Sequence, residues 1–205
     1  MLAVVFGLLP WMFVRIKSWQ LIVALAAAVL LDAAGLAAGL RLYPWTNLPV
    51  AAIATTGGIL MGRAVPPRFR AMMLLLLALA ILDTVQVVAT APATTAQGQP
   101  PAGDYYLMFV VATSLANSAI GIGDLLVVAA MAEHWRRRGA GPVVAVAPGV
   151  AGLLITYPTI LVLTRSLPLI PFLFVGFLLT QAAVALRSRT RRISDEQAAT
   201  PNPPL

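Results

Sequence analysis

The chain has 205 residues, of which 60% are apolar and only 10% are charged, and its mean hydropathy is +0.90. A soluble domain of this size carries about twice that charged fraction, so a water-soluble enzyme is excluded. The chain has no cysteine and a single histidine, His134, which excludes disulfides, thiolate chemistry and a histidine-based metal centre. We therefore expect an integral membrane protein without a metal or a cofactor.

Seven apolar segments follow one another along the chain. A helix needs roughly 20 apolar residues to cross a hydrocarbon core about 30 Å thick. The first segment is short and contains Pro10, and the fifth is longer than a membrane requires, so it either tilts strongly or breaks near Asn117–Gly123. The expected fold is an all-α, polytopic transmembrane helical bundle, with segments at 2–14, 19–40, 47–62, 71–91, 105–133, 142–164 and 167–186.

Two further stretches complete the organisation of the chain. Residues 92–104 are rich in Pro, Gly and Ala and predict an external loop. Residues 190–205 combine a mixed charge run with a proline-rich end and predict a disordered cytoplasmic tail. Residues 1–189 then form a single transmembrane domain.

Basic residues gather in alternate gaps between the segments. Loops that face the cytoplasm are enriched in Lys and Arg, so the N-terminus is expected outside and the C-terminus in the cytoplasm. The net charge of +7 would suggest a nucleic-acid partner, but the basic residues are spread over short gaps between apolar segments, which argues against one. The arginine- and alanine-rich composition indicates a bacterial inner membrane. The cytoplasmic set is Arg15, Lys17, Arg63, Arg68, Arg70, Arg136, Arg137, Arg138, Arg187, Arg189, Arg191 and Arg192, against Arg41 and Arg165 outside.

Three of the seven acidic residues, Asp32, Asp83 and Asp124, lie inside predicted spans. The others, Glu133 among them, are expected at membrane edges or in water, and His134 beside it is expected to contact lipid headgroups. An ionised carboxylate deep in a bilayer is costly, so such residues usually face a bundle interior or a water-filled cavity and mark function. The alternative is a protonated carboxyl that bonds between helices for packing.

Asp83 and Asp124 are expected at the same depth. Their spacings from the cytoplasmic Arg70 and Arg136 place both roughly 18–20 Å from that edge, on consecutive antiparallel spans, while Asp32 lies somewhat off this level. Two carboxyls a few ångströms apart cannot both ionise, so the pair would hold one proton. Such a pair can activate water for amide hydrolysis without a metal or a covalent intermediate. It can equally relay protons in a transporter.

Asp124 ends the motif Gly121-Ile122-Gly123-Asp124, whose glycines would let a neighbouring backbone approach the carboxylate, although small residues also serve ordinary helix packing. Placed one span after a level aspartate, the motif resembles that of the presenilin and signal peptide peptidase family of intramembrane aspartyl proteases. The resemblance covers residues 71–186 and implies that Asp83 and Asp124 are catalytic. The arginine run that soon follows the motif matches the orientation of signal peptide peptidases.

The family's last span opens with Pro-Ala-Leu, which borders the active site and helps to hold substrate. The counterpart here is Pro168-Leu169-Ile170, so the resemblance implies that Pro168 and Leu169, with Gly121 and Gly123, lie beside the substrate. Three features depart from the family: Leu82 replaces a tyrosine, Leu169 replaces the alanine, and seven spans replace nine. The prepilin peptidases share Gly-x-Gly-Asp but carry a lysine two residues later, where this chain has Leu126.

These features favour an aspartic endopeptidase that cleaves transmembrane or signal-peptide helices with a water-activating aspartate pair. One alternative is a small proton-coupled transporter that uses the same carboxylates. Another is a catalytically silent relative of the protease family, for which Leu82 and Leu169 are the best arguments. The expected partners are a transmembrane peptide and the lipid bilayer.

Overall fold

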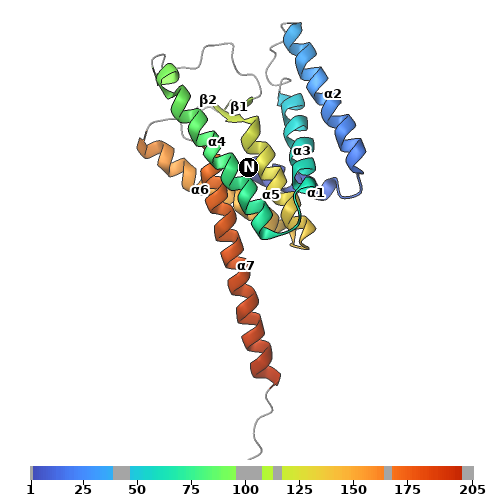
Figure 1. Ribbon diagram of the computed structural model, residues 1–205, viewed down its shortest axis with the longest axis vertical. Coiled ribbons are helices and arrows are strands. Elements are labelled where there is room, and N and C mark those ends of the chain that lie inside the picture. The colour runs from blue at the N-terminus through green and yellow to red at the C-terminus, as the bar shows by residue number, and fades with distance from the viewer. Residues whose placement is uncertain (1, 39–46, 96–107, 113–116, 164–167, 200–205) are drawn as a thin grey trace, which may run out of the picture.

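The computed structural model describes residues 2–38, 47–95, 108–112, 117–163 and 168–199, and this part of the chain is helical apart from one short hairpin. Each of the seven predicted segments overlaps one helix (Figure 1). The helices are α1 (Leu2–Met12), α2 (Ser18–Ala37), α3 (Asn47–Ala64), α4 (Phe69–Thr95), α5 (Ile122–Arg137), α6 (Pro142–Leu163) and α7 (Ile170–Ala199).

The fifth predicted segment is broken rather than a single tilted helix. Strands β1 (Met108–Ala112) and β2 (Asn117–Gly121) pair antiparallel, with Val110 opposite Ala119, and α5 begins only at Ile122. The expectation of a purely helical fold is therefore wrong for this stretch. A short apolar run such as Phe109–Val111 fits a strand as well as a helix, because periodicity alone does not separate the two.

Two helices continue further than the sequence predicts. The last residues of α4 take up part of the expected external loop, since the helix ends at Thr95. Residues 190–199, expected to be disordered, belong to α7. This stretch contains neither Gly nor Pro, the residues that most disfavour a helix, and the next proline is Pro201. The loop residues 96–104 and the tail residues 200–205 lie outside the described part of the chain.

Helix α5 forms the centre of the molecule and packs closely against α3. Gly58 and Gly62, four residues apart, lie on the face of α3 that meets α5. A Cβ added at Gly58 would lie 2.6 Å from the Cβ of Ala129, and one at Gly62 would lie 2.7 Å from the carbonyl oxygen of Ala130. Neither distance leaves room for a side chain, so these glycines set how closely the two helices approach.

The other helices surround α5. Helix α1 packs against α5 and α6, α4 packs against α7, and α2 packs on the outside of α3 (Figure 1). Gly152 of α6 and Gly176 of α7 bring those two helices into close contact, because a Cβ on Gly176 would overlap the carbonyl oxygen of Pro148. The core is built from buried side chains of α4, α5 and α7: Met72, Leu76, Leu125, Val128, Met131, Leu173 and Phe177.

Large apolar side chains also cover the outer surface. Within the described part of the chain, three helices are long and apolar enough to cross a membrane, at Ser18–Gly35, Phe69–Gln86 and Ile170–Thr190. Their outward side chains are exposed and apolar, for example Ile22 and Leu30 of α2 and Ile81 of α4. A continuous exposed apolar surface of this kind marks contact with a membrane or another protein. Helix α1 has 11 residues and extends only about 16 Å, roughly half the thickness of a hydrocarbon core.

Candidate active site

Asp83 lies on α4 and is half-buried where this helix meets the start of α7. Its Oδ2 atom accepts a hydrogen bond from the backbone N–H of Ile170, at 3.0 Å. Ile170 is the first residue of α7, and the first four N–H groups of a helix have no partner within that helix. The carboxylate of Asp83 therefore satisfies one of the free donors at the N-terminus of α7.

Asp124 lies in the first turn of α5 and is also half-buried. The preceding Gly121 has an extended conformation, and its backbone N–H donates a hydrogen bond to the Asp124 carboxylate. A Cβ on Gly121 would lie 3.2 Å from Oδ2 of Asp124, a tighter contact than side chains normally make. A side chain at position 121 would therefore crowd the Asp124 carboxylate.

Gly123 does not play the same role within the chain. It is exposed, and a Cβ added there would meet no described atom within 4 Å. At Gly121 the close contact is with the side chain of Asp124 itself, while the surface beside Gly123 is open. An open surface next to Asp124 leaves room for a group from outside the chain.

Asp83 and Asp124 lie within range of each other's charge. Their carboxylates interact electrostatically from α4 and α5. Each also accepts one backbone N–H at the beginning of a helix, α7 for Asp83 and α5 for Asp124. The positive end of a helix stabilises a nearby negative charge, so the two helix termini offset part of the mutual repulsion.

Pro168 and Leu169 lie directly before Ile170 and are half-buried. The carbonyl oxygen of Leu169 accepts hydrogen bonds from Phe172 and Leu173, at 3.0 and 3.1 Å, so the bonding of α7 starts here. The Ile170–Asp83 bond fixes this turn beside the aspartate pair. The start of α7 therefore lies beside Asp83.

Two other residues singled out in the sequence lie apart from the pair. Asp32 is half-buried on α2, and no described hydrogen bond or ion pair joins it to Asp83 or Asp124. Leu82, which stands where the resembling family has tyrosine, is 64% exposed on the apolar surface of α4. Its side chain contributes to the outer surface rather than to the surroundings of the aspartates.

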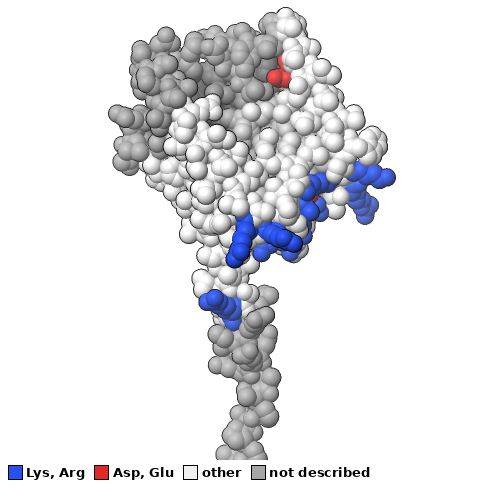
Figure 2. Space-filling view, in the orientation of Figure 1, with Lys and Arg blue, Asp and Glu red and all other residues white. Residues whose placement is uncertain are grey.

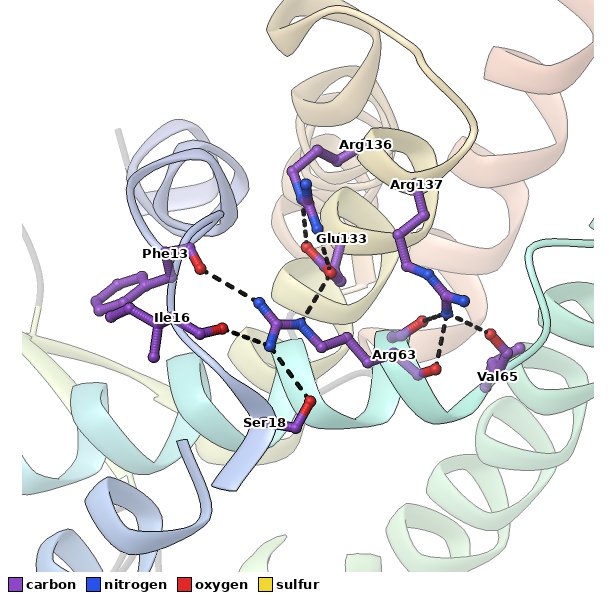
Figure 3. A network of polar contacts seen from close by, with 9 residues as sticks. Phe13, Ile16, Ser18, Arg63, Val65, Glu133, Arg136 and Arg137 are labelled. Atoms are coloured by element: carbon purple, nitrogen blue, oxygen red, sulfur yellow. Dashed lines mark hydrogen bonds and ion pairs between the residues drawn. The ribbon is translucent and has the colours of Figure 1, made fainter. Parts of the chain in front are cut away.

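A buried ion cluster at the opposite end of α5 was not predicted (Figure 3). Glu133, expected at a membrane edge or in water, is fully buried. Both of its oxygens accept hydrogen bonds from Arg136, at 2.7 Å each, and Oε1 also accepts one from Nε of Arg63 at 3.2 Å. Glu133 is therefore not in water, because these arginines satisfy its charge inside the protein.

The arginines of this cluster also bind the ends of neighbouring helices (Figure 3). Arg63 donates to the carbonyl oxygens of Phe13 and Ile16, which follow α1. Arg137 donates to the carbonyl oxygens of Gly62, Arg63 and Val65, at 2.7–3.0 Å, and so satisfies acceptors at the end of α3. Residues expected only to set orientation thus also join α1, α3 and α5.

His134 is likewise buried rather than in contact with headgroups. Its ring lies 5.9 Å from that of Phe177, and Phe177 stacks on Phe69 at 5.5 Å. Neither ring nitrogen has a hydrogen-bond partner among the described residues. Trp135, next to it, is also buried and is covered by the guanidinium of Arg138, 4.8 Å from the ring centre.

The described residues contain no group of three or more His, Asp or Glu side chains that could hold a metal ion. The described groups at the site are the carboxyl groups of Asp83 and Asp124 and the backbone N–H donors of Ile170 and Gly121. Comparison with protein-family models, with curated proteins and with solved structures found no match to this chain.

Proposed function

We propose that this protein is an intramembrane aspartyl protease of the presenilin and signal peptide peptidase type, with Asp83 and Asp124 as its catalytic pair. The observation that carries the proposal is that two acidic side chains from consecutive apolar segments lie within range of each other's charge. The hydrogen bond from the backbone N–H of Ile170 to Asp83 adds support, since it places the start of α7 beside one member of the pair.

The proposed reaction needs only groups that the site contains. The ionised aspartate takes a proton from water while the neutral aspartate gives its proton to the carbonyl oxygen of the scissile amide. Addition of the hydroxide forms a tetrahedral diol, and transfer of a proton to the amide nitrogen then lets the carbon–nitrogen bond break. Because the pair titrates as a unit, neither residue is assigned the acid or the base role.

The hairpin before α5 supports access of water and substrate to this site. Non-helical backbone is tolerated at membrane depth only where protein or a water-filled cavity satisfies its polar groups. Strands β1 and β2 satisfy each other along their paired edges and lead directly into Gly121 and Asp124. A hydrolase working inside a bilayer requires a sheltered, hydrated region of this kind.

We further propose that the chain crosses the cell membrane several times, with the C-terminus in the cytoplasm and the N-terminus towards the outside. Basic side chains gather at the end of the body from which α7 extends (Figure 2). This end carries the turns after α1, α3 and α5, as the charge alternation predicts.

Cleavage of a model transmembrane peptide by purified protein in detergent or liposomes tests the proposed activity. Asp83→Ala and Asp124→Ala should each reduce cleavage to background while keeping the elution profile and melting temperature of the wild type. Asp32→Ala is the matched control: it also removes a carboxylate from a predicted span, but one outside the pair, so cleavage should persist.

Two results would contradict the protease. The first is no cleavage by the wild type across a panel of transmembrane and signal peptides, and the second is full activity in either variant of the pair. Proton flux into liposomes that depends on both aspartates, without peptide cleavage, would instead support the proton-coupled transporter.

A further inference from the structure

The start of α7 contains very few backbone donors. Pro168 and Pro171 have no N–H, so in the turn Pro168–Pro171 only Leu169 and Ile170 can donate. The N–H of Ile170 bonds to Oδ2 of Asp83, a residue 87 positions earlier in the chain. This contact thus links α7 directly to a candidate catalytic carboxylate on α4.

The donor is held in place by packing. The side chain of Ile170 is 8% exposed, and Leu173 and Phe177, which follow it on α7, are fully buried in the core. Phe177 in turn stacks on Phe69 at the beginning of α4. Because these contacts hold α7 against α4, the N–H of Ile170 has little freedom to move relative to Asp83.

Thr84, next to Asp83 on α4, does not compete for this bond, because its hydroxyl donates to the carbonyl oxygen of Ala80 at 2.7 Å. The first turn of α7 carries no acidic residue that would repel the carboxylate, while Asp124 on α5 interacts with Asp83 electrostatically. The Ile170 N–H is therefore a donor that is well placed to fix one oxygen of Asp83.

We propose that the backbone N–H of Ile170 is a positioning group for Asp83. It holds Oδ2 and leaves Oδ1 for the attacking water and for the proton shared with Asp124. The Pro168–Ile170 turn then acts on catalysis through the carboxylate itself, in addition to bordering the substrate. This inference rests on the proposed protease function, but the bond can also be tested without activity.

Ile170→Pro removes the N–H and keeps a residue that the first turn of a helix accepts. Since misplacement of a catalytic group by about 1 Å can cost a hundredfold in rate, kcat should fall roughly ten- to a hundredfold. KM should stay within about twofold, because the substrate-facing Pro168 and Leu169 remain. Ile170→Val, which keeps the donor and trims the side chain, should retain wild-type kcat. An equal loss in both variants, or no loss in Ile170→Pro, would overturn the proposal.

Amide exchange provides the readout that does not need cleavage. Protein labelled with ¹⁵N-isoleucine gives one amide signal for Ile170, assigned by its disappearance in Ile170→Val. That amide should exchange slowly with solvent deuterium in the wild type and in Asp124→Ala, and at least tenfold faster in Asp83→Ala. Equal exchange in Asp83→Ala and the wild type would refute the positioning role, whether or not the protein cleaves any peptide.

Discussion

Glu133 is a fully buried carboxylate whose charge is balanced inside the protein. Removing a charge from water costs several kcal/mol, which is recovered only when the partners are close and the hydrogen bonds complete. Arg136 donates two hydrogen bonds to the Glu133 carboxylate and Arg63 donates a third, so both carboxylate oxygens have partners. Both guanidiniums remain partly exposed, at 17 and 18%, and therefore keep some of their hydration.

Glu133→Gln is expected to destabilise the fold, because it leaves two cations in close contact without a countercharge. Loss of one partner from a buried ion pair costs about 3–5 kcal/mol, and the exposure of the arginines favours the lower end of that range. Thermal or denaturant unfolding in detergent measures the change. Arg68→Gln, at an exposed cation with no described side-chain partner, should leave stability within about 0.5 kcal/mol. Equal stability of both variants with the wild type would show that the cluster is not structural.

At the scale of single residues, the orientation of a helix about its axis could not be predicted from the sequence. Counting from the cytoplasmic arginines gives an expected depth for Asp83 and Asp124, because the rise per residue is fixed. The burial of Glu133 depends on which face of α5 meets α3, and α5 is apolar on almost every side. Only the spacing of Glu133 and Arg136, neighbours on one helix face, hinted at the ion pair.

At the scale of elements, apolar length predicted where helices exist but not where they end. Each of the seven predicted segments overlaps one helix, because a helix satisfies its own backbone in any apolar environment. The break before α5 and the continuation of α7 to Ala199 depend instead on strand pairing and on the absence of helix breakers. Hydropathy does not report either property.

The contact between α3 and α5 gives the element-scale prediction. Gly58→Ala and Gly62→Ala would each place a Cβ against the backbone or side chains of α5, within 2.5–2.7 Å of its nearest atom. Overpacking of this kind costs about 1–3 kcal/mol, so both variants should unfold at lower temperature or denaturant concentration. Gly141→Ala is the control, since a Cβ there would meet no described atom within 4 Å. If all three variants unfold at the same temperature or denaturant concentration as the wild type, α3 and α5 do not pack as described.

At the scale of the whole molecule, the positions of the basic side chains and of the exposed apolar surface favour one orientation of the protein in a membrane. Basic side chains collect at the end where α7 leaves the body (Figure 2), and the outer faces of α2 and α4 are apolar above it. Cytoplasmic anionic lipids and the positive-inside bias both favour that end in the cytoplasm. The candidate aspartates lie on the far side of the buried Glu133 cluster from this end, with Asp124 at one terminus of α5 and Glu133 near the other.

The absence of cysteine makes this orientation directly testable. Single cysteines at Ser188, on the exposed part of α7, and at Gly98, in the expected external loop, can be labelled with a membrane-impermeant maleimide in intact bacteria. Gly98→Cys should react at once, and Ser188→Cys only after the cells are permeabilised, because the bilayer separates the two positions. Leu82→Cys, which is 64% exposed on α4 but faces lipid in the proposed arrangement, should react poorly in both conditions. A reversed pattern would invert the topology, and fast labelling of Leu82→Cys would mean that this face of α4 lies in water, which would remove the membrane setting on which the proposed protease depends.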